Sequence, residues 1–196
     1  MDLNQKIVVS LERISQAFRV LLWNESKQLG LSPIQIQILN FLLTHSREKR
    51  KISYLAKEFD LTKATISDSV KILFRKSFVD KEYAPKDSRS YTLHLTSKGL
   101  ETATKTSVFF SQIENSVDKL PQSEKENLLI NLIGIIDALH NSGVISMQRM
   151  CFSCSHYSRD YDGNPHFCKL MNRSLLNQDL QINCPEFESI KIPPIV

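Results

Sequence analysis

The candidate reactive side chains of this chain, judged by their type and spacing, are its four cysteines. Cys151 and Cys154, with two residues between them, place two thiolates on one tight turn, where both can bind the same metal. Four thiolates from a loop-rich segment suit tetrahedral zinc. They equally suit an iron–sulfur cluster, whose last ligand is often followed by proline, as Cys184 is here. We predict a metal site, with zinc as the preferred cofactor and a cluster as the alternative, at Cys151, Cys154, Cys168 and Cys184.

Two other interpretations of the cysteines stay open. The thiols could be free, or Cys151 and Cys154 could form a redox pair. His156 and His166 are close enough in sequence to act as alternative ligands, although surface positions are the simpler interpretation. All four cysteines fall in the last quarter of the chain. In a reducing cytosol such a cluster is more typical of a metal site than of a disulfide framework.

The composition indicates a folded protein with long helices. The chain has 196 residues, 41% of them hydrophobic and 23% charged, and only five glycines and seven prolines interrupt it. This length suits one domain, or one domain with an appendage. No signal peptide and no apolar run of roughly 20 residues is visible, so we expect a cytoplasmic protein without a membrane partner. No nucleophile–base pair or phosphate loop stands out, so we expect no enzymatic activity.

Periodic apolar residues predict six helices and two strands. The first helix has a stripe with spacings of 4, 3, 4 and 3, formed by Ile7, Leu11, Ile14, Phe18 and Leu21. The last helix is apolar nearly all round, which points to a partner subunit. The helices are expected at residues 4–27, 33–45, 54–59, 63–76, 97–119 and 123–140, and the strands at residues 78–84 and 91–96.

The middle of the chain has the order of a DNA-binding unit. A short helix, a tight turn and a second helix capped by Thr62 form a helix-turn-helix. The two strands and the polar tip between them, residues 85–90, form a wing. Residues 46–98 hold 13 Lys and Arg against 7 Asp and Glu, a net charge of +6, while the whole chain carries +4. Positive charge is thus concentrated where phosphate contacts are needed.

Each part of this unit has an expected role on DNA. The N-terminal half of a recognition helix enters the major groove, so Lys63, Thr65, Ser67 and Lys71 are the candidates for base or phosphate contacts. Arg89 at the wing tip can reach the adjacent minor groove, and Asp87 can hold its guanidinium. A solvated turn pair is the alternative for these two residues.

These motifs resemble the MarR family of transcription regulators. The wing carries Asp87-Ser88-Arg89, then Leu93, then Leu95-Thr96-Ser97-Lys98-Gly99, and the helix-turn-helix carries Leu55-Ala56, Leu61 to Ser67, and Val70. The similarity covers roughly residues 5–140. It implies a homodimer on a pseudo-palindromic operator, with an interface formed by the first, fifth and sixth helices. It also implies control by a small aromatic ligand or by thiol oxidation.

Two positions depart from the family pattern. Ser77 stands after the recognition helix where the family usually has glycine, so another residue must accept the turn or the turn differs. Asp68 stands where a basic residue is frequent. Its carboxylate can accept from cytosine or orient Lys71, but it repels phosphate.

The sequence therefore predicts a mainly α-helical protein with a small β-wing. A winged helix at about residues 32–98 lies within a DNA-binding and dimerisation domain of residues 1–146, and a loop-rich cysteine appendage follows at residues 147–196. The predicted function is a homodimeric DNA-binding transcription regulator, controlled by a small ligand or by the cysteine metal site. The alternative is a winged-helix protein–protein interaction module with a zinc-stabilised docking appendage.

Overall fold

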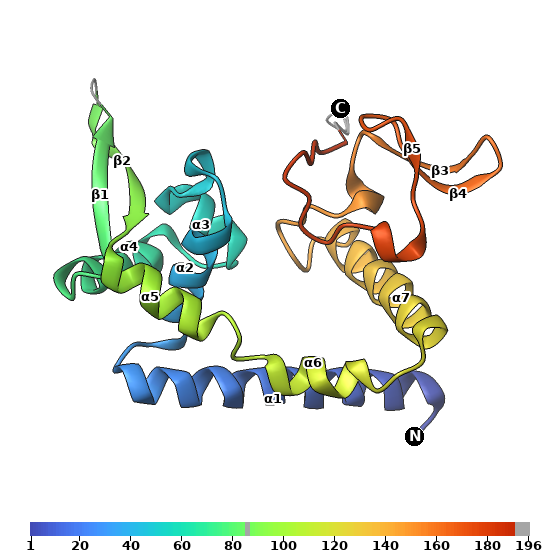
Figure 1. Cartoon of the computed structure of the whole chain (residues 1–196), viewed down its shortest axis with the longest axis horizontal. Coiled ribbons are helices and arrows are strands. Elements are labelled where there is room, and N and C mark those ends of the chain that lie inside the picture. Colours follow the sequence, from blue (N-terminus) through green and yellow to red (C-terminus); the bar gives the residue numbers. More distant parts are fainter. Residues whose placement is uncertain (85–86, 191–196) are drawn as a thin grey trace. The chain divides into compact units, whose positions relative to one another are not determined.

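Two separate hydrophobic cores organise the chain, whose helices and strands are drawn in Figure 1. The computed structural model describes residues 1–84 and 87–190, with the backbone alone at residues 84 and 87–90. The chain divides into an N-terminal unit, Met1–Ser116, and a C-terminal unit, Val117–Val196. Each unit contains one of the cores. The secondary structure is mainly helical with two small sheets, which confirms the predicted fold class.

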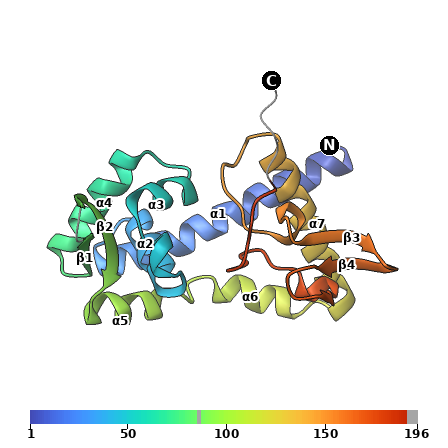
Figure 2. The ribbon, with the colours of Figure 1, turned by 90° about the horizontal axis from the view of Figure 1, so that it is seen from above.

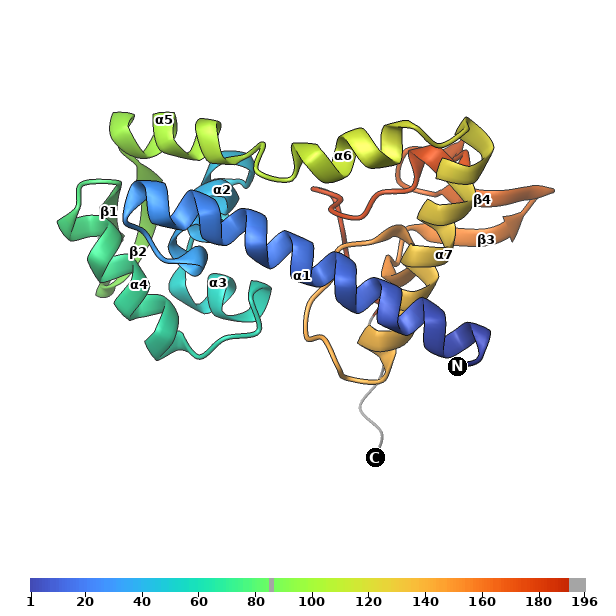
Figure 3. The same cartoon turned by 90° about the horizontal axis from the view of Figure 1, so that it is seen from below.

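Helix α1 (Leu3–Leu29) is the longest element and the least covered one. Asp2 and Gln5 start it with a capping box, in which each side chain accepts from the other residue's backbone N–H. Only Leu22 and Ser26 are buried, both near the C-terminal end. Figure 3 shows α2 beginning beside that end of α1. Most of the helix surface is therefore available to a partner.

Three further helices build the helix-turn-helix over the first core. They are α2 (Pro33–Thr44), α3 (Ile52–Glu58) and α4 (Lys63–Arg75), and all three lie within two residues of the predicted bounds. A short 3-10 turn, η1 (Arg47–Lys49), lies in the basic loop before α3. The fully buried side chains of this core are Ile36, Ile38, Leu39, Leu42, Leu55, Ile66, Val70, Leu73, Val79 and Leu93, with Ala103 of the next helix.

The wing is a two-stranded antiparallel hairpin. Strand β1 (Val79–Ala84) pairs with β2 (Asp87–Leu95), which starts earlier than the predicted residue 91. The backbone N–H of Leu93 donates to the carbonyl of Arg50 at 3.0 Å, and Arg47 pairs with Glu82. These contacts hold the basic loop against the base of the wing, so the loop is more than a solvated connection.

The predicted single helix at residues 97–119 is wrong. The structure has two helices, α5 (Ser97–Thr106) and α6 (Ser111–Asp118). Asn40 of α2 donates from Nδ2 to the carbonyl of Thr106 at 3.3 Å and accepts from the Thr106 hydroxyl at 2.8 Å. Phe109 packs against the first core and donates its N–H to Thr106 at 3.2 Å, one residue short of an α-helical bond. A contact from a distant helix therefore ends α5, and local periodicity does not reveal it.

The C-terminal unit builds its core from helix α7 (Gln122–Asn141) and the cysteine segment. Buried residues of the two segments meet, namely Ile133 of α7 with Met150, Cys151, Leu175 and Leu180. The two units divide between Ser116 and Val117. The domain boundary near residue 146 stays a prediction.

The cysteine segment is more ordered than the predicted loop-rich appendage. Strands β3 and β4 lie side by side (Figure 2), and β5 pairs with β4 to complete a three-stranded antiparallel sheet. The elements after α7 are η2 (Cys151–Ser153), β3 (Tyr157–Tyr161), β4 (Asn164–Cys168), β5 (Arg173–Ser174) and η3 (Asn177–Asp179).

Ser77 accepts the turn for which the family uses glycine. Its φ is 59°, in the left-handed region. The turn is closed by the N–H of Phe78, which donates to the carbonyl of Leu73 at 2.9 Å, and by the N–H of Ser77, which donates to Phe74 at 2.9 Å. This is a helix ending in which glycine is usual because a Cβ is strained there. The turn is thus retained at a cost in backbone strain.

Replacing Ser77 with glycine should therefore stabilise the N-terminal unit. The left-handed conformation costs an L-residue about 1–2 kcal/mol, and the larger unfolded-state entropy of glycine takes back about 0.5–1 kcal/mol. We expect Ser77→Gly to raise the free energy of unfolding by about 0.5–1 kcal/mol in denaturant titration. The matched control is Ser107→Gly, where φ is −63° and glycine should destabilise. Equal losses in both variants would contradict the strain at Ser77.

Candidate DNA-binding interface

Helix α4 presents one polar face and buries the other. Ile66, Ser69 and Val70 are buried against the core. Of the candidate contact residues, Lys63, Thr65 and Lys71 are exposed, while Ser67 is half-buried. The exposed face therefore carries two lysines and a hydroxyl, and Ser67 is less available than the sequence predicts.

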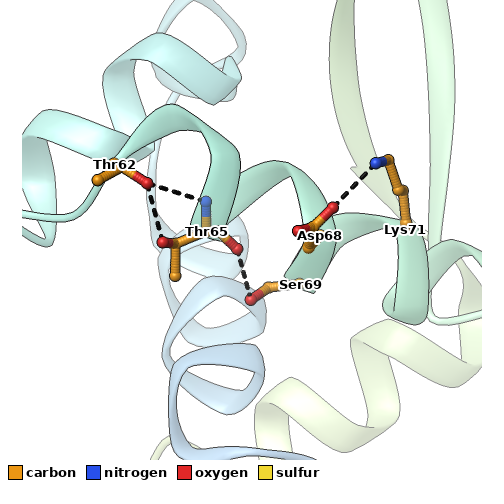
Figure 4. A network of polar contacts seen from close by, with 5 residues as sticks. All are labelled: Thr62, Thr65, Asp68, Ser69 and Lys71. Atoms are coloured by element: carbon orange, nitrogen blue, oxygen red, sulfur yellow. Dashed lines mark hydrogen bonds and ion pairs between the residues drawn. The ribbon is translucent and has the colours of Figure 1, made fainter.

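Thr65 has a structural task at the start of α4 (Figure 4). The hydroxyl oxygen of Thr62 accepts from the backbone N–H of Thr65 at 3.1 Å, and the two hydroxyls lie 2.9 Å apart. Ser69 donates from its hydroxyl to the Thr65 carbonyl at 3.0 Å. The predicted cap at Thr62 is confirmed, and the Thr65 hydroxyl is fixed beside the positive end of the helix dipole.

Asp68 forms an ion pair with Lys71, as the sequence suggested it could. Lys71 Nζ lies 2.9 Å from Asp68 Oδ1, and the side chains are 62% and 71% exposed, respectively (Figure 4). A pair this open to solvent contributes little to stability and is easily broken. A phosphate that approaches Lys71 can therefore displace the carboxylate, whose charge still opposes the approach.

Sequence reasoning missed two basic side chains, Arg75 at the end of α4 and Lys81 on β1. Lys81 of β1 lies over the rings of Phe74 and Tyr91, with Nζ 5.0 and 4.8 Å from the ring centroids. Phe74, whose spacing along α4 suits the core, is instead 46% exposed and forms part of this support. Lys81, Arg75 and Lys71 share a surface depression between α4 and β1. The two rings belong to residues seven positions before and ten positions after Lys81, so the residues next to Lys81 in the sequence gave no signal for this contact.

Tyr91 remains a neutral phenol in this setting. Partial burial raises its pKa above the usual value, and the neighbouring Tyr83 adds to the rise, while Lys71 acts in the opposite direction. The ring therefore offers Lys81 an uncharged face at neutral pH. Within the depression itself, the acidic side chain beside Lys71, Arg75 and Lys81 is Asp68.

The wing residues keep the status of predictions. Asp87 and Arg89 belong to β2, so their backbone is extended and not part of a turn. Their side chains lie outside the described residues. The roles assigned to them, minor-groove contact by Arg89 and support by Asp87, rest on the sequence alone.

The four predicted metal ligands are brought together in the C-terminal unit. All four cysteines line one pocket, and none of them forms a disulfide. Burial raises the pKa of the Cys151 thiol, a hydrogen bond from the backbone of Gln181 lowers it, and the other three cysteines raise it further. Yet in residues 1–84 and 87–190 no group of three or more His, Cys, Asp or Glu side chains is arranged to hold a metal ion.

Comparisons with known proteins agree with the winged helix. A family model described as a winged helix DNA-binding domain matches residues 31–99. The chain is 28% identical over 109 residues to YkoM, an uncharacterized HTH-type transcriptional regulator of Bacillus subtilis (strain 168), covering 55% of this chain and 70% of YkoM. The crystal structure of the S. aureus MepR–DNA complex matches with a TM-score of 0.59 and 22% identity, over 67% of this chain and 97% of MepR. A MarR protein from Peptoclostridium difficile matches with a TM-score of 0.60 and 23% identity, over 72% of this chain and 91% of that protein. The chain is a winged-helix protein with the fold of the MarR family.

The MarR fold accounts for only part of the chain. MepR is covered almost completely, whereas the cysteine segment extends beyond the region that matches MarR proteins. YkoM is described as a transcriptional regulator and not as an enzyme, in agreement with the expectation from the sequence. Within the described ranges, no helix is long and apolar enough to cross a membrane.

The cap at Thr62 should be measurable as stability. Thr62→Ala removes the oxygen that accepts from the Thr65 N–H, and loss of such a cap typically costs about 1 kcal/mol. Thr62→Ser keeps the acceptor and should stay close to the wild type. Denaturant titrations of the three proteins check this expectation. Equal stability of the alanine and serine variants would show that the hydroxyl does not cap α4.

Proposed function

We propose that this chain is a transcription regulator that binds double-stranded DNA as a homodimer, with one α4 in each major-groove half-site of a pseudo-palindromic operator. The observation that carries the proposal is the exposed polar face of α4 beside the β1–β2 wing, with Lys71, Arg75 and Lys81 around one depression. This arrangement suits DNA. The polar side chains of a capped helix contact base edges in a groove, and a hairpin next to the helix contacts the DNA backbone.

Charge supports DNA as the partner of this surface. Residues 46–98 carry +6 of net charge, while the rest of the chain carries −2. Phosphate contacts supply most of non-specific binding, so the affinity of this unit should fall as salt rises. MepR, whose fold this chain shares, has been solved as a complex with DNA.

A second copy of the chain is the partner proposed for the apolar surface of α1. Large apolar side chains on one stripe of this helix are between 39% and 71% exposed, namely Leu3, Ile7, Ile14 and Phe18. Single exposed apolar residues are ordinary, but a long series on one helix marks an interaction site. Resemblance to MarR regulators implies that this helix belongs to the dimer interface.

Helix α7 offers a second surface of the same kind. Leu128, Ile135 and Leu139 are each about 40% exposed, and their spacings of seven and four residues place them on one face. Ile133, on another face, is fully buried. The helix is therefore apolar on two sides, and its own unit covers only one of them. Pairing through α1 and α7 gives both exposed faces an occupant.

Release from DNA requires a signal that acts on this dimer. The resemblance to MarR regulators implies a small aromatic ligand or thiol chemistry. The cysteine pocket packs in the same core as α7, so a change at the cysteines would be transmitted to a helix of the proposed interface.

Removing a single positive charge from the recognition face should weaken DNA binding measurably. We expect Lys71→Ala to lower affinity and to reduce the slope of log affinity against log salt by about 1, because one phosphate contact is lost. The measurement is fluorescence anisotropy with a duplex enriched by the full chain from a random-sequence pool. The control is Lys105→Ala, a lysine of similar exposure on α5 that pairs with Glu101 at 2.6 Å.

The same assay tests the wing. Arg89→Ala should sharply weaken binding if the arginine enters the minor groove. Unchanged affinity in this variant would overturn the role of Arg89, and failure of the unmodified chain to enrich any duplex would overturn the proposed function.

The dimer can be tested with two aspartates on opposite faces of α1. Ile14→Asp puts a charge within the apolar stripe, and Gln16→Asp puts the same charge on the far side of the helix, since two residues turn it by about 200°. Sedimentation equilibrium should show a dimer for the wild type and Gln16→Asp, and a monomer or much weaker dimer for Ile14→Asp. Dimers of equal strength in both variants would exclude this face of α1 from the interface.

A further inference from the structure

We propose that the four cysteines of the C-terminal unit bind an iron–sulfur cluster. The proposal concerns the unit that extends beyond the MarR match, and it does not depend on the function proposed above. It goes against the preference for zinc that the sequence suggested. Size and arrangement of the pocket are the reasons.

Backbone contacts bring the four cysteines together from separate parts of the chain. Cys154 donates its N–H to the carbonyl of Cys151 at 2.9 Å, which makes the turn between them. Cys168 ends β4 and stands opposite Tyr157, three residues after Cys154. Cys184 donates its N–H to the carbonyl of Arg149 at 2.9 Å, two residues before Cys151. Each of the two distant cysteines is thus fixed beside the first pair by main-chain hydrogen bonds.

All four cysteines line one cavity. Its volume is about 190 Å³, several times the roughly 30 Å³ that one water occupies in the liquid. Tetrahedral zinc with bonds of about 2.3 Å needs all four sulfurs within about 4 Å of one another. The described residues contain no group of three metal-binding side chains arranged to hold an ion. Four thiols around an open cavity suit a group that has volume of its own.

An iron–sulfur cluster is such a group. Its iron and sulfide ions occupy the centre, and cysteines bind its irons from around the outside, so the thiolates need not meet. Beside the cysteines, the cavity is lined by apolar side chains, including Leu170, Met171, Leu175 and Pro185, and by charged ones, namely Arg173, Asp179 and Glu186. Pro185 also follows the last cysteine, as is frequent for cluster ligands.

One hydrogen bond already addresses a ligand sulfur. The backbone N–H of Gln181 donates to Cys151 Sγ at 3.2 Å. Hydrogen bonds of this type stabilise the negative charge of a bound thiolate and help to set the potential of a cluster. The return bond from the Cys151 N–H to the Gln181 carbonyl, at 3.1 Å, holds the two backbones together.

Purification of the full chain without oxygen tests the proposal directly. We expect a brown protein with broad absorption in the blue that bleaches on reduction, and with iron and acid-labile sulfide in equal amounts, about two or four of each per chain. Incubation of the metal-free chain with ferric iron, sulfide and a thiol reductant in the absence of oxygen should restore the absorption. One zinc per chain without sulfide, or no metal after this incubation, would overturn the proposal.

Single substitutions test the ligand set. Cys151→Ser, Cys154→Ser, Cys168→Ser and Cys184→Ser should each lose most of the absorption and iron. His156→Ala is the matched control, because His156 lines the same pocket but is not assigned as a ligand. Retention of a full cluster in any serine variant, or its loss in His156→Ala, would refute a four-cysteine site. Circular dichroism identifies a variant that has unfolded, and the metal content of the wild type decides the proposal without any variant.

Discussion

The position of α4 relative to the β1–β2 wing depends on a close contact between the backbones at the start of α5 and the start of the wing. A Cβ placed on Gly99 would lie 1.9 Å from the carbonyl oxygen of Phe78, so only glycine fits there without movement of one backbone. The same carbonyl accepts the N–H of Thr96 at 3.1 Å, and the Ser77 carbonyl accepts the Thr96 hydroxyl at 2.7 Å. The end of α4, the first residues of the wing and the cap of α5 therefore meet at one place. Their relative positions decide whether helix and hairpin can contact one DNA duplex together.

What the sequence predicted well is what depends on neighbours along the chain. The cap at Thr62 needs only an acceptor three residues before its donor, and the buried face of α4 follows from the helical period. Apolar and polar residues alternate along the strands of the wing because one face of the hairpin is covered. Ser77 could be singled out because a left-handed turn after a helix has a known preference for glycine, although the sequence could not say that serine would adopt it.

What it missed is decided by contacts between distant residues. Asn40 ends α5 because its side-chain amide donates to the Thr106 carbonyl, and no property of residues 97–119 alone indicates that contact. Phe74 has the right spacing for the core, yet it lies under Lys81 from the next strand. The cysteines could be grouped by type, but their arrangement around a cavity follows from the pairing of β3 with β4 and from the contact at Arg149. That arrangement is the reason why we propose a cluster in place of a single ion.

Helix α7 belongs both to the core of the cysteine segment and to the proposed dimer interface. One of its faces puts Ile133 into a core with Cys151, and another exposes Leu128, Ile135 and Leu139 where a second subunit is proposed to pack. A group that binds the folded cysteine segment and not the unfolded one stabilises that segment by mass action. Because Cys151 and α7 belong to one core, the free energy of binding that group also stabilises the packing of α7 in this core. Loss of the group would then loosen the helix from its own unit before it disturbed α4, whose core is separate. In a regulator built this way, loss of the bound group alters the proposed dimer interface while α4 stays folded.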